Sequence, residues 1–171
     1  MEFTAIVSLF ESNLWSYHLP VPEPVAQHFI KDSTDRRVVC VLNGEEKIHA
    51  AIMPKKDAGH FLMLSKELRK KLGVDLGSEV HVKMEKDDSK YGMPMPDEMQ
   101  EALYMDPEAD QLFHQLTAGK QRSLIYIAAK PKSSNKRIEK AIVILEHLKT
   151  QGGKIDFKQL NIDFKEANRL I

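Results

Sequence analysis

The stretch YHLPVPEPVAQHF at residues 17–29, followed by RRVVCVL at 36–42, has the same pattern as HFLMLSKELRKKL at 60–72, followed by SEVHVKM at 78–84. In both places a short apolar run precedes a segment with helical spacing, and an alternating apolar run follows, which predicts strand, short helix and strand. Val21, Val25 and Phe29 of the first stretch match Leu64, Leu68 and Leu72 of the second at one constant offset, as copies of one unit would. Because a single unit of this kind buries its apolar face poorly, we expect two copies to pack about a pseudo-two-fold axis and close one β-barrel.

Turn and capping residues support these elements. We expect strands at residues 2–10, 17–21, 37–42, 46–53, 60–64 and 78–85, with a turn at 54–59. Asn43-Gly44 favours the positive φ angles of a tight type I′ hairpin between two of these strands. Ser65 is a good N-cap for the helix in SKELRKKLG, and Gly73 stands where a left-handed residue would end that helix.

The chain changes character after Asp88, where SKYGMPMPDE holds two prolines and a glycine and indicates a linker. Helical spacing follows. We expect helices at 97–104, from 107 onward, from 117 or 118 to 129 and from 134 to about 149, and short helical turns in 154–171. In the longest helix, the residues expected to face inward are Ile138, Ala141, Ile142, Leu145 and Leu148.

Composition limits the class of protein. The 171 residues include 25 basic and 25 acidic side chains, so no overall charge attracts nucleic acid or an anionic membrane. No apolar run approaches the roughly 20 residues that span a bilayer, and the first residues lack the pattern of an export signal. We therefore expect a soluble cytoplasmic protein. Its one cysteine, Cys40, lies in the apolar run VVCVL, which favours a buried, inert thiol.

Two levels of resemblance emerge from longer segments. LSKELRKKLGVDLGSEVHVKMEKDD at 64–88 resembles the swapped-hairpin barrel half of AbrB and MazE-type DNA-binding proteins. The whole chain is closer to a bacterial family that joins a domain of unknown function to a YdeI/OmpD-associated, or bacteriocin-protection, region. The segments that carry this second resemblance are PVPEPVAQHF, YGMPMPDE, DPEADQLFHQLTAGKQRSLIYIAAK and KRIEKAIVILEHL.

The second resemblance implies an α+β protein with a double-split β-barrel formed by one chain, where AbrB-like proteins use two, followed by a small helical C-terminal region. We place the barrel domain at 1–89, the linker at 90–96 and the YdeI/OmpD-associated-like region at 97–171. The family name implies a link to antimicrobial-peptide resistance rather than a reaction. Relatives often carry an acid-threonine-arginine run where this chain has Ser133-Ser134-Asn135.

Catalytic and metal-binding patterns are not evident in the sequence. The seven histidines, at 18, 28, 49, 60, 81, 114 and 147, form neither a helical i, i+4 pair nor a Cys/His metal spacing, so we expect them at the surface and at strand edges. Asp87-Asp88 imitates a carboxylate pair, but neighbouring residues point apart, and we expect a solvated turn. We expect no cofactor, and the sequence favours a binding protein over an enzyme.

Basic residues of the C-terminal region suggest an anion or ligand site. The residues we assign to it are Lys120, Gln121, Arg122, Lys136 and Arg137, with Trp15 and Tyr126 as aromatic side chains suited to a pocket wall. Pairing with the acidic segment 97–110, which holds six acids and no base, explains the same charges without a ligand.

A second basic group is the candidate DNA-binding surface. It combines Lys66, Arg69 and Lys70 of a predicted helix with Lys55 and Lys56 of the preceding loop. A solvated helix face also explains these residues, and we favour that explanation. The first copy of the repeat has PEPVAQHF, without lysine or arginine, where the second has the basic segment SKELRKKL. A symmetric basic surface is therefore missing.

We expect an uncharacterised cytoplasmic binding or stress-protection protein that is a monomer or weak homodimer. Its partner would be a small anion or a peptide. An AbrB-like DNA-binding regulator is the first alternative, and an enzyme with an unrecognised site is the second.

Overall fold

The computed structural model describes residues 1–11, 17–31, 35–56 and 59–169. The chain divides into two compact units, Met1–Asp88 and Ser89–Ile171, each with a hydrophobic core of its own. Among the described residues, no helix is long and apolar enough to cross a membrane.

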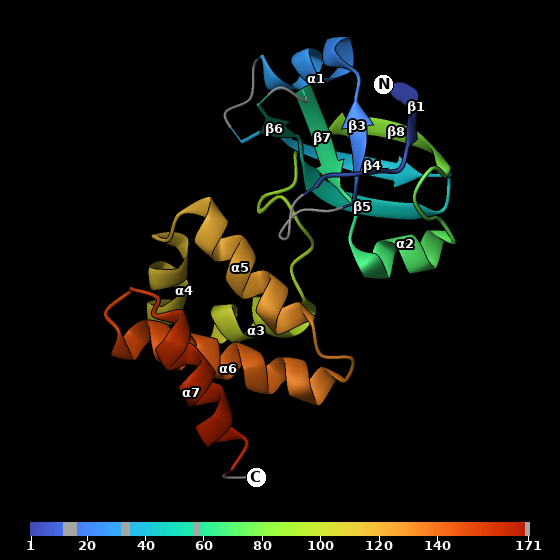
Figure 1. The fold of residues 1–171 in the computed structure, drawn as a ribbon. Coiled ribbons are helices and arrows are strands. Elements are labelled where there is room, and N and C mark those ends of the chain that lie inside the picture. Colours follow the sequence, from blue (N-terminus) through green and yellow to red (C-terminus); the bar gives the residue numbers. More distant parts are fainter. Residues whose placement is uncertain (12–16, 32–34, 57–58, 170–171) are drawn as a thin grey trace. The chain divides into compact units, whose positions relative to one another are not determined.

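Two four-stranded antiparallel sheets form the N-terminal unit (Figure 1). The first has the order β1 (Glu2–Ile6), β8 (Glu79–Lys86), β4 (Arg37–Leu42), β5 (Glu46–Ala51). The second has the order β2 (Ser8–Leu9), β3 (Tyr17–Val21), β7 (Gly59–Met63), β6 (Met53–Lys55). The sequence predicted an α+β fold, which is confirmed, whereas closure of these sheets into a double-split barrel stays a prediction.

The chain passes directly from one sheet to the other at two buried residues. Val7 joins β1 to β2 and Ile52 joins β5 to β6. Their amides donate hydrogen bonds to backbone carbonyls of Ser78 and Arg36, at 2.8 and 2.9 Å. The predicted strands 2–10 and 46–53 are therefore each divided, and β6 extends into the segment predicted as a turn. The reason is that a strand shared by two sheets bends where it changes partner.

The predicted strand–helix–strand order is confirmed in both copies, as β3–α1–β4 and β7–α2–β8, where α1 is Glu23–Ile30 and α2 is Lys66–Leu72. In each copy the first strand joins the second sheet and the second strand joins the first sheet. The two first strands pair with each other, and so do the two second strands. The copies thus occupy equivalent places in the strand pairing.

Local sequence signals behave largely as expected. Asn43 and Gly44 have φ angles of 51° and 72°, and the amide of Glu45 donates to the carbonyl of Leu42 at 3.0 Å. Because Leu42 pairs with Glu46, the loop holds three residues rather than the two of the tightest hairpin. Ser65 caps α2 by accepting a hydrogen bond from the amide of Leu68, and Gly73 ends this helix at a φ of 63°.

The core of the N-terminal unit comes from alternate residues of its central strands. The fully buried residues of β4 are Val38, Cys40 and Leu42, and those of β8 are Val80, Val82 and Met84. Burial raises the pKa of the Cys40 thiol to about 12, so the predicted burial of this cysteine is confirmed and its inertness stays a prediction. Asp87 corrects a prediction, because its carboxylate is buried and accepts a 2.8 Å hydrogen bond from His49 rather than facing solvent.

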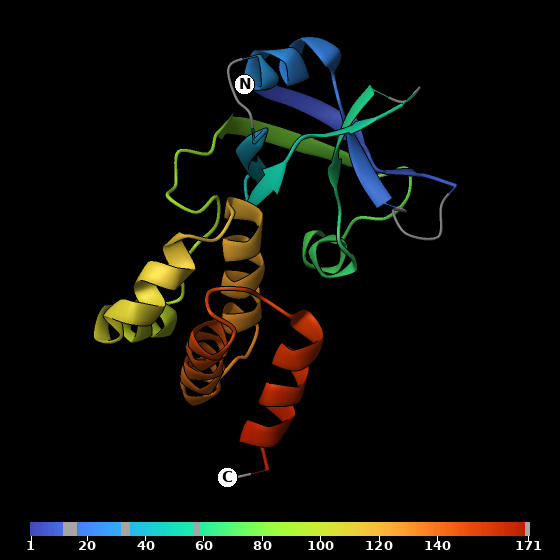
Figure 2. The ribbon, with the colours of Figure 1, turned by 90° about the vertical axis from the view of Figure 1, so that its left-hand side faces the viewer.

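Five helices form the C-terminal unit (Figures 1 and 2). They are α3 (Asp97–Met105), α4 (Pro107–His114), α5 (Ala118–Ala129), α6 (Ser134–Thr150) and α7 (Phe157–Ala167). Helix α6 packs against each of the other four. The short turns predicted for the last residues are in fact one 11-residue helix, capped by Asp156. Tyr91, inside the predicted linker, is buried against this core and donates or accepts a 2.8 Å hydrogen bond with His114.

The inward face of α6 differs from the predicted one. Ala141, Leu145 and Leu148 are buried as expected, whereas Ile138 and Ile142 are 41% and 50% exposed. Ile144 and His147 are buried in their place. Because four helices pack around α6, its buried face is wider than the predicted stripe and is shifted toward Ile144 and His147. The part of the apolar stripe that holds Ile138 and Ile142 remains uncovered.

Two histidines are buried, which corrects the expectation of scattered surface histidines. His18 stacks on Phe10 in the N-terminal unit, at 3.5 Å between ring centroids. His147 Nδ1 lies 2.6 Å from Asp163 Oδ2, and its Nε2 accepts a 3.2 Å hydrogen bond from the amide of Asp156. One imidazole thereby connects α6 to the start and the middle of α7.

Replacing His147 by leucine removes both hydrogen bonds and leaves the Asp156 amide without its acceptor. We expect the free energy of unfolding to fall by about 1–3 kcal/mol, the usual cost of buried groups that lose their partners. Urea titration followed by circular dichroism measures this change. The control Glu166→Leu, at an exposed position of α7, should shift it by no more than about 0.5 kcal/mol. Equal losses in the two variants would contradict the proposed role of His147.

Candidate functional site

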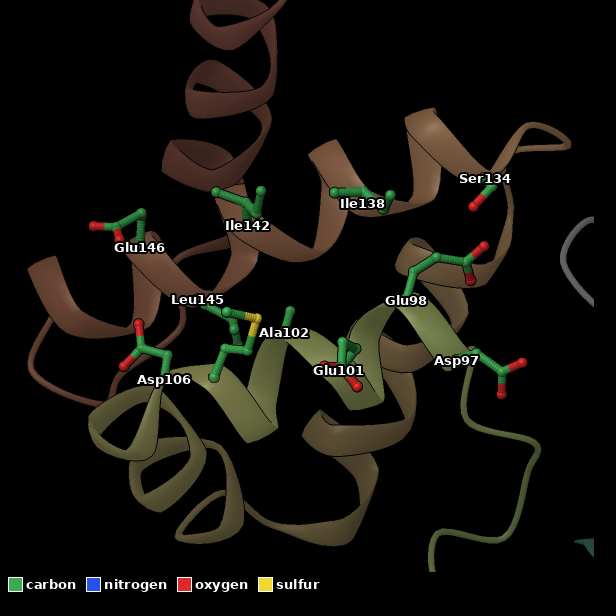
Figure 3. Close-up of a pocket in the computed structure, with 11 residues that line it drawn as sticks. Asp97, Glu98, Glu101, Ala102, Asp106, Ser134, Ile138, Ile142, Leu145 and Glu146 are labelled. Atoms are coloured by element: carbon green, nitrogen blue, oxygen red, sulfur yellow. The ribbon is translucent and has the colours of Figure 1, made fainter.

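A groove of about 760 Å³ lies between α3 and α6 (Figure 3). We call it the α3/α6 groove. Its lining residues are Asp97, Glu98, Glu101, Ala102, Met105, Asp106, Ser134, Ile138, Ile142, Leu145 and Glu146. All of them belong to α3, to α6 or to Asp106, the residue that ends α3 and caps α4.

The floor of the groove is apolar. On α6, Ile138 and Ile142 are four residues apart and therefore share one face of the helix, as Figure 3 shows. On α3, Met105 is 76% exposed and Ala102 leaves space because its side chain is small. Single exposed apolar side chains are common on protein surfaces and need no explanation. Several large ones gathered in one solvent-exposed hollow are typical of an interaction site.

The rim of the groove is acidic. Five of the lining residues are carboxylates, namely Asp97, Glu98, Glu101, Asp106 and Glu146, and no lysine, arginine or histidine lines the groove. Figure 3 shows these carboxylates along α3 and at both ends of the apolar floor. The groove therefore presents apolar surface framed by negative charge.

An ion pair closes one end of the groove and ties α3 to α6. Arg137 donates to Glu98 Oε1 at 2.7 Å and also to the carbonyls of Pro131 and Lys132, so its guanidinium is held within the protein. Hydrogen bonds from Arg137 and then Ser134 lower the pKa of Glu98 to about 2. The carboxylate stays charged over a wide pH range.

A second ion pair closes the other end. Lys149 Nζ lies 2.7 Å from both Asp106 Oδ2 and Glu146 Oε1. Hydrogen bonds with Lys149 lower the pKa of Asp106, and those with Asp106 and Glu146 raise the pKa of Lys149. One cation faces two carboxylates here, so a negative charge remains. Asp97 and Glu101 have no ion pair among the described residues, which adds to the negative charge of the rim.

The basic residues assigned from the sequence to an anion site are distributed over two helices. Lys120 and Gln121 lie in the first turn of α5, where the Gln121 amide donates to the carbonyl of Phe113 at 3.1 Å. Lys136 and Arg137 lie in the first turn of α6, and four residues separate the start of this helix from the end of α5. These two groups are therefore at opposite ends of α5, and the structure does not bring them together.

The remaining residues of that assignment have different surroundings. Lys136 pairs with Glu139 at 2.6 Å, Arg122 is half-buried in α5, and Tyr126 is 56% exposed beside a different pocket. Trp15 lies outside the described residues. Arg137 pairs with the acidic segment, which is the ligand-free explanation given above. An anion site made from the assigned set stays a prediction.

Two of the candidate DNA-binding residues make contacts within the N-terminal unit. Lys55 Nζ lies 3.4 Å above the Phe10 ring, and the Arg69 guanidinium lies 3.4 Å above the ring of Tyr17 and donates to Asp75. Lys66 and Lys70 of α2 are exposed, as is Lys56. A DNA-binding surface made from this set stays a prediction.

The pair formed by His49 and Asp87 was missed by sequence reasoning. His49 lines a pocket of about 540 Å³ beside β5 and α2, and the buried Asp87 carboxylate holds its Nδ1. Such pairing orients an imidazole, which can then exchange a proton at Nε2. Within the described ranges, no group of three or more histidine, cysteine, aspartate or glutamate side chains is arranged to hold a metal ion.

The α3/α6 groove was also missed, although one signal for it was present. The segment 97–110 carries six acids and no base, and it forms the acidic side of the groove. The apolar floor gave no signal, because Ile138 and Ile142 fit the same helical period as the buried core residues. Only the packing of α3, α4, α5 and α7 distinguishes them.

The structure is that of an α+β protein of two units, with the α3/α6 groove in the C-terminal unit. Residues 3–84 match a domain of unknown function, DUF1905, and residues 93–148 match the family described as bacteriocin-protection, YdeI or OmpD-associated. The chain thus joins a DUF1905 domain to a YdeI/OmpD-associated domain, as its sequence predicted. The comparison with curated proteins gives no match.

The Glu98–Arg137 ion pair gives the stability of the protein a defined pH dependence. The pKa of Glu98 is about 2 in the folded state against a usual 4.5, so its stabilisation is complete above pH 4.5 and is lost as the pH falls toward 2. We expect Glu98→Gln to lose less stability than the wild type between these pH values. Urea midpoints measured across this pH range test this. Glu108→Gln, at an exposed position outside the groove, should keep the wild-type slope, and a wild-type slope in Glu98→Gln would contradict the assignment.

Proposed function

We propose that the protein is a binding protein whose α3/α6 groove captures a cationic amphipathic peptide segment in helical form. The observation that carries this proposal is the combination of three exposed apolar side chains, Met105, Ile138 and Ile142, with an acidic rim. Neither feature alone would specify the ligand. Together they match a ligand that has an apolar face and basic flanks.

The dimensions of the groove suit a short helix. Helix α3 has nine residues and, at about 1.5 Å per residue, offers a wall of about 13 Å. A docked helix of two to three turns would place apolar side chains at i, i+3 or i+4 and i+7 on the floor, as in other helix-in-groove complexes. The volume of about 760 Å³ can hold several such side chains.

Charge complementarity selects a basic ligand. Lysine and arginine can lay their apolar stems along Ile138 or Met105 while their charged ends reach the rim carboxylates. Asp97 and Glu101 are exposed and available for this contact. An acidic peptide would meet the same rim with like charge, which is unfavourable.

The family description supports a protective role. It names protection against bacteriocins, and a groove that sequesters cationic amphipathic peptides would provide a physical route to such protection. The proposed activity is capture rather than chemistry, so it requires no catalytic group. We also propose, from the sequence alone, that the protein acts in the cytoplasm as a monomer or weak homodimer.

The alternatives have weaker support. A DNA-binding regulator would have to use α2, where Arg69 is held by Tyr17 and Asp75. An enzyme would have to use the oriented imidazole of His49, for which the pocket lining indicates no particular substrate. The α3/α6 groove is the site whose shape and charge together specify a ligand class.

The test is a fluorescence anisotropy titration with a labelled amphipathic helical peptide of leucine and lysine. We expect the full chain to bind it and the double variant Ile138→Ser/Ile142→Ser to bind at least about tenfold more weakly, because burial of the apolar face is lost. Glu101→Lys should weaken binding and reduce its salt dependence. The matched control is Ile162→Ser, at an exposed isoleucine of α7 that does not line the groove.

Two comparisons make this test decisive. A peptide with glutamate in place of lysine should not bind, and a peptide of the same composition in scrambled order should bind weakly. If the groove double variant and Ile162→Ser bind the leucine-lysine peptide equally well, the proposed function is wrong.

A further inference from the structure

The opposite face of α6 carries a second concave surface with a different character. Lys136, Lys140 and Val143 are centred about 150° around the helix from the residues of the α3/α6 groove, at the roughly 100° per residue of an α-helix. Two adjoining pockets of about 300 and 360 Å³ lie here, between α6, α5 and α7. They share Pro131, Lys140 and Phe164, and we call them together the Lys140 pocket.

Aromatic and apolar side chains form much of the Lys140 pocket. Tyr126 of α5 and Phe157 of α7 are 56% and 44% exposed, and Phe164 and Leu160 lie deeper. Exposed aromatic rings on the wall of a hollow offer flat surfaces to a planar ligand. Tyr126 and Lys136 of the sequence-derived ligand assignment line this pocket, together with a cation that forms no ion pair among the described residues.

That cation is Lys140. Its Nζ lies 3.4 Å from the centroid of the Phe164 ring, and the side chain is half-buried. Among the described residues it forms no ion pair, because Glu139, the acid beside it, is paired with Lys136. Burial, and then the charge of Lys136, lower the pKa of Lys140.

The other polar groups around Lys140 do not neutralise it. Lys130 lines the same pocket, and Asn161 and Asn168 contribute uncharged amides. The pocket thus holds three lysines against one glutamate that is already paired. A partly desolvated ammonium without a counter-ion is costly, and a bound anion would relieve that cost.

We propose that the Lys140 pocket binds a planar organic anion, an aromatic carboxylate or sulfonate, with its anionic group at Lys140 and its ring against Tyr126 and Phe157. Lys130 provides a second cation for the same anionic group or for another substituent. The site does not depend on the peptide-binding function proposed for the α3/α6 groove. The two faces of α6 take ligands of opposite charge.

The probe for this site is 8-anilinonaphthalene-1-sulfonate, an aromatic sulfonate whose fluorescence rises on binding. Titrated against the full chain, it should bind the wild type, and Lys140→Met should bind it at least about tenfold more weakly. Methionine keeps the length of the side chain and removes the charge. Lys165→Met, at an exposed lysine of α7 that does not line the pocket, is the matched control and should bind as the wild type does.

A neutral probe separates charge from apolar contact. N-phenyl-1-naphthylamine lacks the sulfonate, so Lys140→Met should change its affinity by less than about twofold, whereas Tyr126→Ala should weaken both probes. Circular dichroism confirms that each variant is folded. Equal affinity of Lys140→Met and Lys165→Met for the sulfonate probe would overturn the proposal. Loss of sulfonate binding in Ile138→Ser/Ile142→Ser would also overturn it, because that result would locate the probe in the α3/α6 groove.

Discussion

Burial of helix α6 is the constraint on which the C-terminal unit depends. Helices α3, α4, α5 and α7 all pack against it, and Ala141, Ile144, Leu145 and Leu148 supply the fully or nearly fully buried side chains. These four shorter helices do not cover the surface of α6 evenly. Gaps between the covering helices become the α3/α6 groove and the Lys140 pocket, and their chemistry follows from which residues of α6 face each gap.

Ion pairs at the two ends of the α3/α6 groove hold its walls together, and the middle of the groove stays open. Glu98 with Arg137 and Asp106 with Lys149 connect the two helices directly or through the start of α4. Between these pairs, α3 presents Ala102, whose small side chain does not cover Ile138 and Ile142. Exposed apolar surface is unfavourable in the free protein, and this unfavourable exposure is what a ligand with an apolar face would remove.

The Lys140 pocket shows the same helix with the opposite electrostatic character. Phe164 packs over Lys140 from α7, and Glu139, which lines the same pocket, is paired with Lys136. Acidic residues are concentrated on α3, and lysines on the far side of α6. The chain therefore has a net charge of zero but carries one acidic and one basic surface. Local fields, rather than the total charge, therefore decide which ions each of these surfaces attracts.

Much of the fold was determined by the sequence alone, because it depends on interactions between near neighbours. The strand at Arg37–Leu42, the cap and stop of α2 at Ser65 and Gly73, and the paired strand–helix–strand units follow from alternation, side-chain capping and the conformational freedom of glycine. Sheet membership was decided by the tertiary structure, since Val7 and Ile52 carry one strand each into two sheets. The same holds for Asp87 and His49, which are 38 residues apart and whose contact no local pattern encodes. It holds above all for Ile138, Ile142 and Lys140: their residue types are fixed by the chain, but whether a neighbour covers or pairs them is fixed only by how four other helices pack around α6.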